Sequence, residues 1–228
     1  MRVAVTTASD SYACWEEALH SVGLEPLSLP CIEVHPAAEP ILADARRRAA
    51  AADLLFVTSA RAVRILWPAG GFPSSPAAAV GEATAAAVEQ AGGIVAVCGD
   101  GDGDDLVDLV IDGVSGRRVF FPAARHADSA RGRRLSAAGA HLDVEAVYAT
   151  VPIAPGADPA DAVVFGSPSS IEGWEMARRL DEVPVTAVMG SVTAAALRQR
   201  GREPDVIPER PSVAAIARGL ANLMERTS

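Results

Sequence analysis

The chain has 228 residues, half of them hydrophobic and 21% charged, with a formal net charge of −9 at pH 7. This length provides one large domain or two of roughly 100 residues each, and the negative charge argues against a nucleic-acid-binding surface over the whole protein. No apolar run reaches the roughly 20 residues of a membrane span and the chain opens on a strand pattern, so we expect a soluble cytoplasmic protein without a membrane partner.

The cysteines and histidines show no metal or disulfide pattern. Cys14, Cys31 and Cys98 are odd in number and widely separated, and the four histidines lack a partner at helical ligand spacing. We therefore expect packed thiols and no metal site.

Strand and helix patterns alternate along the chain. The expected strands are residues 2–7, 24–29, 53–59, 77–80, 94–98, 117–122, 161–167 and 185–189. The expected helices are residues 9–23, 41–52, 60–66, 81–92, 106–113, 129–138, 190–201 and 213–226. Residues 30–36 and 141–151 read as extended segments, and residues 152–159 as a proline-rich linker.

One strand, turn and helix unit occurs twice. Residues 81–92 and 190–201 both follow an apolar run, begin at a glycine, have threonine at the fourth position and end at or near a glycine. Ser59 precedes Gly81, and Ser167 precedes Gly190, by spacings that differ by one residue. This order indicates duplication of a larger unit, and hence two similar lobes.

The alternation predicts an α/β fold with parallel sheets and helices on both faces. If one lobe both begins and ends the chain, the linkers near 31–36 and 149–156 pair as a two-stranded antiparallel ribbon, which acts as a hinge. We then expect residues 1–34 with 152–228 in lobe 1, and residues 37–148 in lobe 2.

Ligands of parallel sheets bind beyond the carboxyl ends of the strands, where helix N-termini present unpaired amides. Every repeated turn lies at such an end, so the turns would line one cleft between the lobes. The candidate binding residues in these turns are Ser59, Gly81, Thr84, Ser167, Gly190, Ser191 and Thr193. Their hydroxyls and amides suit a carboxylate or phosphate, although glycine and threonine also serve as ordinary turn and cap residues.

Two further residues are candidates near these turns. Arg61 would begin a helix that faces the cleft. Tyr148 enters the second linker, where its phenol could donate a hydrogen bond without carrying charge, or could simply pack at the lobe edge.

Two charged segments invite functional interpretations. Residues 99–105 alternate Gly and Asp but match neither a dinucleotide loop nor a calcium loop, so we expect a solvated turn with a helix cap. The basic residues Arg117, Arg118, Arg125, His126, Arg131, Arg133 and Arg134 form either a local attraction for a polyanion or a solvated helix face.

Five short motifs together resemble the uroporphyrinogen-III synthase family over essentially the whole chain. They are FVTSARAV at 56–63, VG-x-x-TA at 80–85, VYATV at 147–151, VFGSPS at 164–169 and MG-x-x-TA at 189–194. The sequence departs from the family pattern at Thr7, where many members have arginine, and in the loop 123–128.

The resemblance implies two flavodoxin-like (Rossmann-like) lobes with the active site in the cleft between them. It implies a lyase that closes linear hydroxymethylbilane to uroporphyrinogen III, with inversion of the last ring and loss of water, without metal or cofactor. Tyr148 would then help the terminal hydroxyl leave. The residues expected to bind the substrate are Ser59, Arg61, Gly81, Thr84, Ser167, Ser169, Gly190, Ser191 and Thr193. A monomer that receives its substrate in a transient handover from hydroxymethylbilane synthase is also expected.

Two rival interpretations remain. A non-catalytic tetrapyrrole-binding regulatory homologue would bind the ligand without isomer control, but it usually carries an output domain that this chain lacks. A two-lobed sugar or amino-acid binding protein fits less well with the missing secretion signal and the serine and threonine turns.

Overall fold

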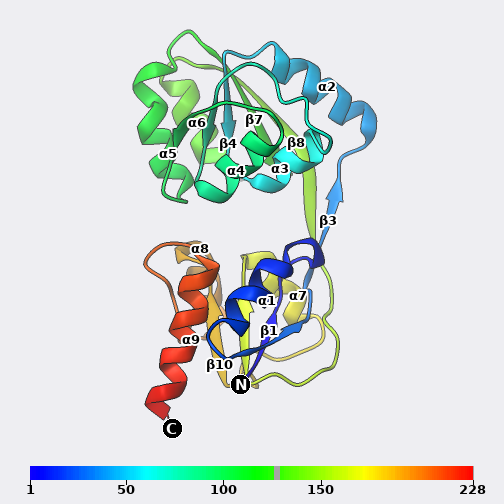
Figure 1. Cartoon of the computed structure of the whole chain (residues 1–228), viewed down its shortest axis with the longest axis vertical. Helices are drawn as coiled ribbons and strands as arrows, with labels where there is room; N and C mark the ends of the chain where they lie inside the picture. The colour runs from blue at the N-terminus through cyan, green and yellow to red at the C-terminus, as the bar shows by residue number, and fades with distance from the viewer. Residues whose placement is uncertain (126–128, 228) are drawn as a thin grey trace. The chain divides into compact units, whose positions relative to one another are not determined.

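The computed structural model describes residues 1–125 and 129–227, which form two compact units (Figure 1). Unit 1 contains residues 1–34 and 150–228, and unit 2 contains residues 35–149. Each unit is built on a largely parallel sheet with helices packed on it, so the predicted α/β class with parallel sheets is confirmed.

Unit 1 has a four-stranded parallel sheet of order β10-β9-β1-β2. Its strands are β1 (Arg2–Val5), β2 (Glu25–Ser28), β9 (Ala162–Phe165) and β10 (Val185–Val188). Its helices are the 3-10 helix η1 (Ser9–Ser11), α1 (Ala13–His20), α7 (Pro168–Glu175), α8 (Ser191–Arg198) and α9 (Val213–Thr227). One core, around Trp15 and Ile216, lies under α1 and α9, and the other, around Phe165 and Trp174, lies under α7 and α8.

Unit 2 carries a six-stranded sheet of order β3-β8-β7-β4-β5-β6. Its strands are β3 (Ile32–Pro36), β4 (Leu54–Val57), β5 (Ala77–Ala79), β6 (Val95–Cys98), β7 (Arg118–Ala124) and β8 (His141–Pro152). The helices are α2 (Glu39–Ala50), α3 (Ala60–Leu66), α4 (Glu82–Gln90), α5 (Gly103–Val110), the 3-10 helix η2 (Ile111–Gly113) and α6 (Ser129–Ala137).

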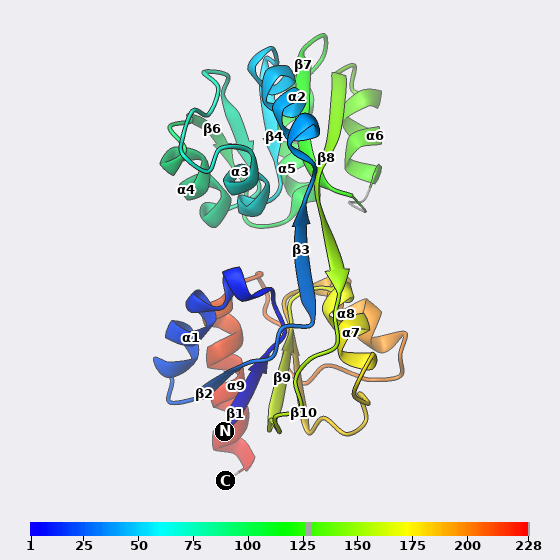
Figure 2. The same cartoon turned by 90° about the vertical axis from the view of Figure 1, so that its right-hand side faces the viewer.

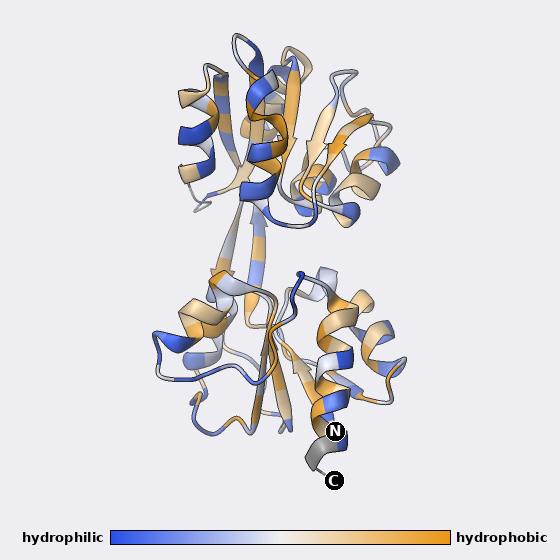
Figure 3. Ribbon diagram, turned by 90° about the vertical axis from the view of Figure 1, so that its left-hand side faces the viewer, coloured by the Kyte–Doolittle hydropathy of each residue, from blue (hydrophilic) through white to orange (hydrophobic). Residues whose placement is uncertain are grey.

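The two faces of this second sheet are covered by different helices. Phe56 and Phe121 pack edge to face beneath α5 and α6, with Leu106 and Leu135 in the same cluster. Phe120 points to the opposite face, where the Arg48 guanidinium of α2 lies 5.7 Å from its ring centre. Successive side chains of β7 point to opposite faces of the sheet, and this alternation decides which helix each residue contacts. Figure 3 shows the same pattern, with apolar strands and helices whose outer faces are polar.

The chain passes between the units through β3 and β8, whose arrows run in opposite directions (Figure 2). Ile153 N–H donates to Cys31 O at 2.9 Å and Ala37 N–H donates to Val147 O at 2.9 Å, which is the register of an antiparallel pair. In unit 1, Gly173 of α7 lies directly against this pair, since a Cβ there would be 1.9 Å from Cys31 O and 2.7 Å from Ile153 O.

The observed helices differ from the predicted ones at their N-terminal ends. The helix expected over 106–113 begins at Gly103 instead, because the Asp102 carboxylate accepts a hydrogen bond from Asp104 N–H at 2.7 Å and caps it. The segment expected as one helix over 9–23 is η1 followed by α1, and it ends at Gly23 with a φ of 74°. His126 and the second half of the loop 123–128, which departs from the family pattern, lie outside the described residues.

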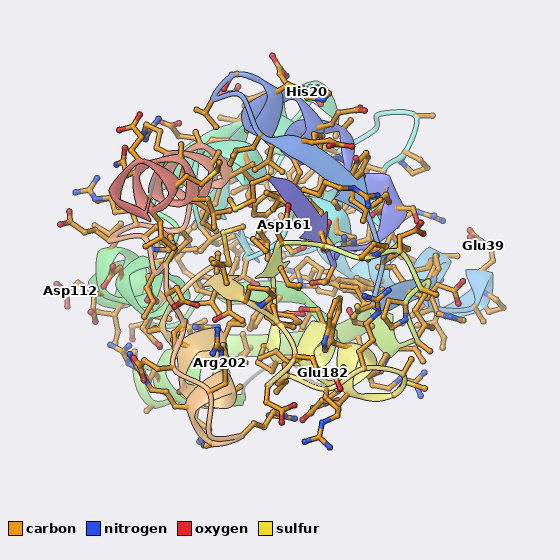
Figure 4. All side chains as sticks on the ribbon, turned by 90° about the horizontal axis from the view of Figure 1, so that it is seen from below. His20, Glu39, Asp112, Asp161, Glu182 and Arg202 are labelled. Atoms are coloured by element: carbon orange, nitrogen blue, oxygen red, sulfur yellow. The ribbon has the colours of Figure 1, made fainter. Side chains whose placement is uncertain are left out.

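Exposed charged side chains surround both units. The labelled His20, Glu39, Asp112 and Glu182 project away from their own elements in Figure 4. Among the described helices, none is long and apolar enough to cross a bilayer. The same residues contain no cluster of three histidine, cysteine or acidic side chains suited to a metal ion.

Candidate functional site

Three of the predicted site residues come together in unit 2, where Ser59 and Arg61 follow β4 and Tyr148 lies within β8. Ser59 is the N-cap of α3, and its Oγ accepts a hydrogen bond from Arg61 N–H at 3.2 Å. Tyr148 is 8% exposed and its phenol donates to the same Ser59 Oγ at 3.3 Å. The Arg61 guanidinium lies 6.0 Å from the centre of the Tyr148 ring. A phenol, a hydroxyl and a cation are thus held side by side.

The first glycine-threonine turn follows β5, which neighbours β4 in the sheet. Gly81 precedes α4, and its carbonyl accepts from Thr84 N–H at 3.0 Å. A Cβ at Gly81 would lie 3.2 Å from the backbone of Gly101, so glycine avoids a crowded contact between the two loops. Thr84 is 4% exposed and its side chain makes no hydrogen bond with the residues that the structure describes. Glu82, which is exposed, adds a carboxylate to this first turn.

The second copy of the turn follows β10 in unit 1. Gly190 is the N-cap of α8 and its carbonyl accepts from Ala194 N–H at 2.9 Å. Thr193 is 4% exposed and, within the described part of the chain, its hydroxyl also has no hydrogen-bond partner. Ser191 lies exposed at the position equivalent to Glu82, and the first turn of α8 carries no acid. This turn is therefore the better receptor for an anion.

Ser167 and Ser169 lie at the start of α7, after the neighbouring strand β9. Ser167 N–H donates to Ser170 Oγ at 3.3 Å, and Ser170 Oγ donates to Ser167 O at 2.7 Å. The two residues form a capping box, in which the Ser167 side chain faces the backbone amide of Ser170 and the Ser170 hydroxyl faces that of Ser167. Ser169 is half-buried.

A further loop lies at the same edge of unit 1 and was not singled out by the sequence patterns. Val206 pairs in parallel with Ala187 of β10, and Val188 N–H donates to Val206 O at 3.0 Å. Residues 207–212 consequently emerge beside the α8 turn, and Pro211 Cγ lies 3.6 Å from the Cβ position of Gly190. This loop brings the exposed Arg210 to the strand ends. The Pro-Ser pair at 211–212 before a helix was the available signal.

The turns of each unit thus meet at the carboxyl edge of its own sheet, in the arrangement that parallel α/β proteins use for ligands. A family model described as uroporphyrinogen-III synthase HemD matches residues 14–218. The chain belongs to the uroporphyrinogen-III synthase family. The family named from the five motifs is confirmed, and nothing in the comparisons supports the regulatory homologue.

Solved structures of this family share the fold at low sequence identity. A mutant uroporphyrinogen III synthase from the extremely thermophilic bacterium Thermus thermophilus is 21% identical, with a TM-score of 0.65 and 99% of each chain covered. Uroporphyrinogen-III synthetase from Helicobacter pylori is 18% identical, with a TM-score of 0.68 over 98% of this chain and all of that one. A search of curated protein sequences gave no match.

Several of the described arginines in the basic set are paired with acidic residues rather than gathered for a polyanion. Arg118 binds Asp53 through three hydrogen bonds, while Arg131 and Arg134 pair with acids of α5. These ion pairs match the alternative of a solvated, charge-balanced surface. Arg125 differs from them, because with Arg133 it lines a cavity of about 660 Å³ beside β7 and β8.

Proposed function

We propose that this member of the uroporphyrinogen-III synthase family is an active lyase that closes hydroxymethylbilane to uroporphyrinogen III. The observation that carries the proposal is the equivalence of Thr84 and Thr193. Each lies at the third position of a helix that follows a parallel strand, is 4% exposed, and has a hydroxyl without a hydrogen-bond partner in the described chain. One such hydroxyl in each unit suits a substrate with many carboxylates.

The proposed binding step uses both sets of turns. In unit 1, Ser167, Ser169, Gly190, Ser191 and Thr193 would present amides and hydroxyls to substrate carboxylates. In unit 2, Ser59, Arg61, Gly81 and Thr84 would do the same. Glu82 would repel a carboxylate at the α4 turn, so we expect the stronger carboxylate contacts on the α8 turn.

The proposed chemical step centres on Tyr148. The terminal carbon–oxygen bond breaks, and the hydroxyl takes a proton from the phenol and leaves as water. The pyrrole nitrogen loses its own proton, which returns to the phenolate, so that an azafulvene forms and the phenol is restored. In the structure Ser59 Oγ accepts a hydrogen bond from the phenol. Between turnovers this hydrogen bond would hold the tyrosine ring in position. Tyr148 is therefore the proposed catalytic residue, and Ser59 a positioning residue as well as a binding one.

The choice between the type I and type III products would depend on how the enzyme positions the last ring, more than on strongly acidic or basic catalytic groups. The azafulvene closes unaided to the type I product, so the enzyme has to hold the substituted carbon of the last ring against the attacking end. We propose that a spiro intermediate forms by that attack and then reopens to place the last ring in the inverted sense. Fixed carboxylate contacts favour this path because they are retained as the ring turns.

The arrangement of the two units, and the state in which the protein works, belong to the same proposal. We propose that the two units are flavodoxin-like lobes, that β3 and β8 act as the hinge, and that the substrate binds in a cleft lined by both carboxyl edges. We also propose a cytoplasmic monomer that receives hydroxymethylbilane in a transient handover from hydroxymethylbilane synthase. Neither a metal nor a cofactor takes part in the proposed steps.

The isomer ratio tests the function directly. Freshly generated hydroxymethylbilane is incubated with and without the protein, and the products are oxidised and separated as type I and type III porphyrins. We expect type III product with the protein and type I without it. Unchanged type I product from a folded sample would contradict the synthase and direct attention to a tetrapyrrole-binding role.

A further inference from the structure

A cavity of about 660 Å³ lies over the face of the unit 2 sheet where α6 adjoins β8. The β8 side chains of Leu142, Val144 and Ala146 share this face because side chains alternate along a strand, and all three line the cavity. Helix α6 contacts the first of them closely, since a Cβ on Gly132 would lie 3.2 Å from Leu142 Cδ2. Val144 is 50% exposed, so α6 leaves this part of the sheet open. Of the residues proposed to bind or convert hydroxymethylbilane, none lines this cavity in the described chain.

The cavity has an apolar floor and a cationic side that faces the solvent. Phe121 is buried in the floor, while the exposed Arg125 and Arg133 line the same cavity. Among the described residues, none forms an ion pair with the Arg125 guanidinium. Glu145 is the acidic residue of the described lining, and its carboxylate is paired with Arg48 of α2. In a chain with a net charge of −9, this cavity is therefore a local attraction for an anion.

A second cavity, in unit 1, shows what arginines do when they serve the fold instead. It has a volume of about 440 Å³ and is lined by Arg178 and Arg179. The Arg178 guanidinium donates to Asp158 O at 2.8 Å, and Arg179 donates to Asp181 Oδ2 at 2.6 Å. Both of these cations are engaged by the protein itself, whereas the Arg125 side chain is left for a ligand.

We propose that the cavity beside α6 binds an amphipathic anion, meaning a ligand with a compact apolar body and a carboxylate or similar anionic group at one end. Cavities of about 300–1,000 Å³ with an apolar lining and few polar groups are typical small-molecule sites. The apolar body contacts Phe121 and Val144, and the Arg125 guanidinium pairs with the anionic group. The substrate of the proposed reaction, which has many carboxylates, does not suit so apolar a floor. The ligand is therefore a second molecule, and the inference goes beyond the proposed function.

The test uses anilinonaphthalenesulfonate, an aromatic monoanion whose fluorescence rises in apolar surroundings, titrated into the full-length native protein. We expect one saturable site in the wild type. Arg125→Gln removes the cation and Val144→Glu places a carboxylate on the floor, so each should raise the Kd by at least about 5-fold. Phenylnaphthylamine has the same rings without the sulfonate, and it should bind the wild type at least about 5-fold more weakly than the anion. Arg125→Gln should not weaken the binding of this uncharged probe.

Two matched variants of unit 2 are the controls. Arg64→Gln removes another exposed arginine, on α3, and Ile94→Glu adds a carboxylate at a residue that is 64% exposed, next to the opposite edge strand β6. Both should keep the wild-type Kd. The site would be overturned by the absence of saturable binding to the wild type, or by the same Kd in all four variants, and equal affinities for the two probes would overturn the anionic class of ligand. Binding of the probe needs no turnover, so failure to form type III product leaves this test intact.

Discussion

The phenol of Tyr148 donates a hydrogen bond to Ser59 Oγ at 3.3 Å, although 89 positions separate the two residues in the chain. The same oxygen accepts from Arg61 N–H at 3.2 Å, so both of its acceptor sites are in use. Arg61 also lies over the tyrosine ring. The ring is therefore fixed from two directions in the absence of substrate, and such a fixed position suits the proton-donor role proposed for it.

Replacing Tyr148 by phenylalanine tests its chemical role. We expect kcat for type III formation to fall by roughly 10- to 100-fold, at or below the low end of the range for general acid catalysis, because the hydroxyl also leaves unaided. KM should change little, since the ring remains. Tyr12→Phe changes the only other tyrosine and is the matched control. Equal rates for Tyr148→Phe and the wild type would reduce Tyr148 to a packing residue.

The unpaired hydroxyl of Thr193 in the described chain predicts a defect in binding rather than in chemistry. Thr193→Val keeps the shape of the side chain and removes the donor, and we expect KM to rise by about 3- to 10-fold with kcat nearly unchanged. Thr193→Ser should behave like the wild type. Initial rates over a range of hydroxymethylbilane concentrations separate the two constants. A valine variant that lowers kcat at constant KM would contradict a role in ground-state binding.

The close packing at Gly173 predicts that even substitution by alanine causes a large loss of stability. A Cβ at this position would lie 1.9 Å from Cys31 O, so Gly173→Ala has to push α7 off the β3–β8 pair. We expect the free energy of unfolding to fall by about 3 kcal/mol or more. Urea denaturation measures it, with Gly113→Ala as control, because no heavy atom lies within 4 Å of that Cβ position. Equal midpoints for the two variants would mean that α7 yields at little cost.

Local signals were enough to predict most elements. Helices expected to stop at Gly23, Gly92, Gly139 and Gly201 do so, and each of these glycines has a positive φ that other residues rarely adopt. Apolar runs such as the one at β4 are buried throughout, as the central strand of a parallel sheet requires. Such features depend only on neighbours in sequence.

Contacts between distant segments could not be predicted in the same way. The bond from Tyr148 to Ser59 depends on the strand order β8-β7-β4, and hydrophobic periodicity carries no information about that order. The arrival of Pro211 beside Gly190 depends likewise on one parallel bridge at Val206. The cavity beside Arg125 depends on how α6 covers β7 and β8, so only coordinates show it.

Asp53 predicts a specific loss of stability in acid. The Arg118 side chain, and then its backbone N–H, hydrogen-bond this carboxylate and hold its pKa at about 2, below the ordinary value of 3.8. Because the folded-state pKa is depressed, the stabilisation is fully present above about pH 4 and is lost as the pH falls toward about 2. Asp53→Asn should therefore lower the Tm at about pH 6 and lower it less at about pH 3.

The exposed Asp112 provides the comparison for Asp53, and Asp112→Asn should leave the Tm unchanged at both values. Thermal unfolding followed by circular dichroism measures both variants against the wild type. A Tm difference for Asp53→Asn that stays constant between about pH 6 and about pH 3 would show that the Arg118 pair does not set the acid response.

The burial of Cys31 predicts that its thiol reacts much more slowly than the other two thiols of the chain. Burial raises its pKa to about 12, and its side chain is fully covered beside β3, so the thiolate that reacts with reagents is almost absent at neutral pH. Cys14 and Cys98 are exposed. A chromogenic disulfide reagent should therefore modify two thiols quickly in the native protein and the third only after denaturant is added. In Cys14→Ser/Cys98→Ser no fast phase should remain, and the slow rate then reports the opening of unit 1 around the β3–β8 pair. A fast phase in that double variant would mean that this part of unit 1 opens readily in the native state.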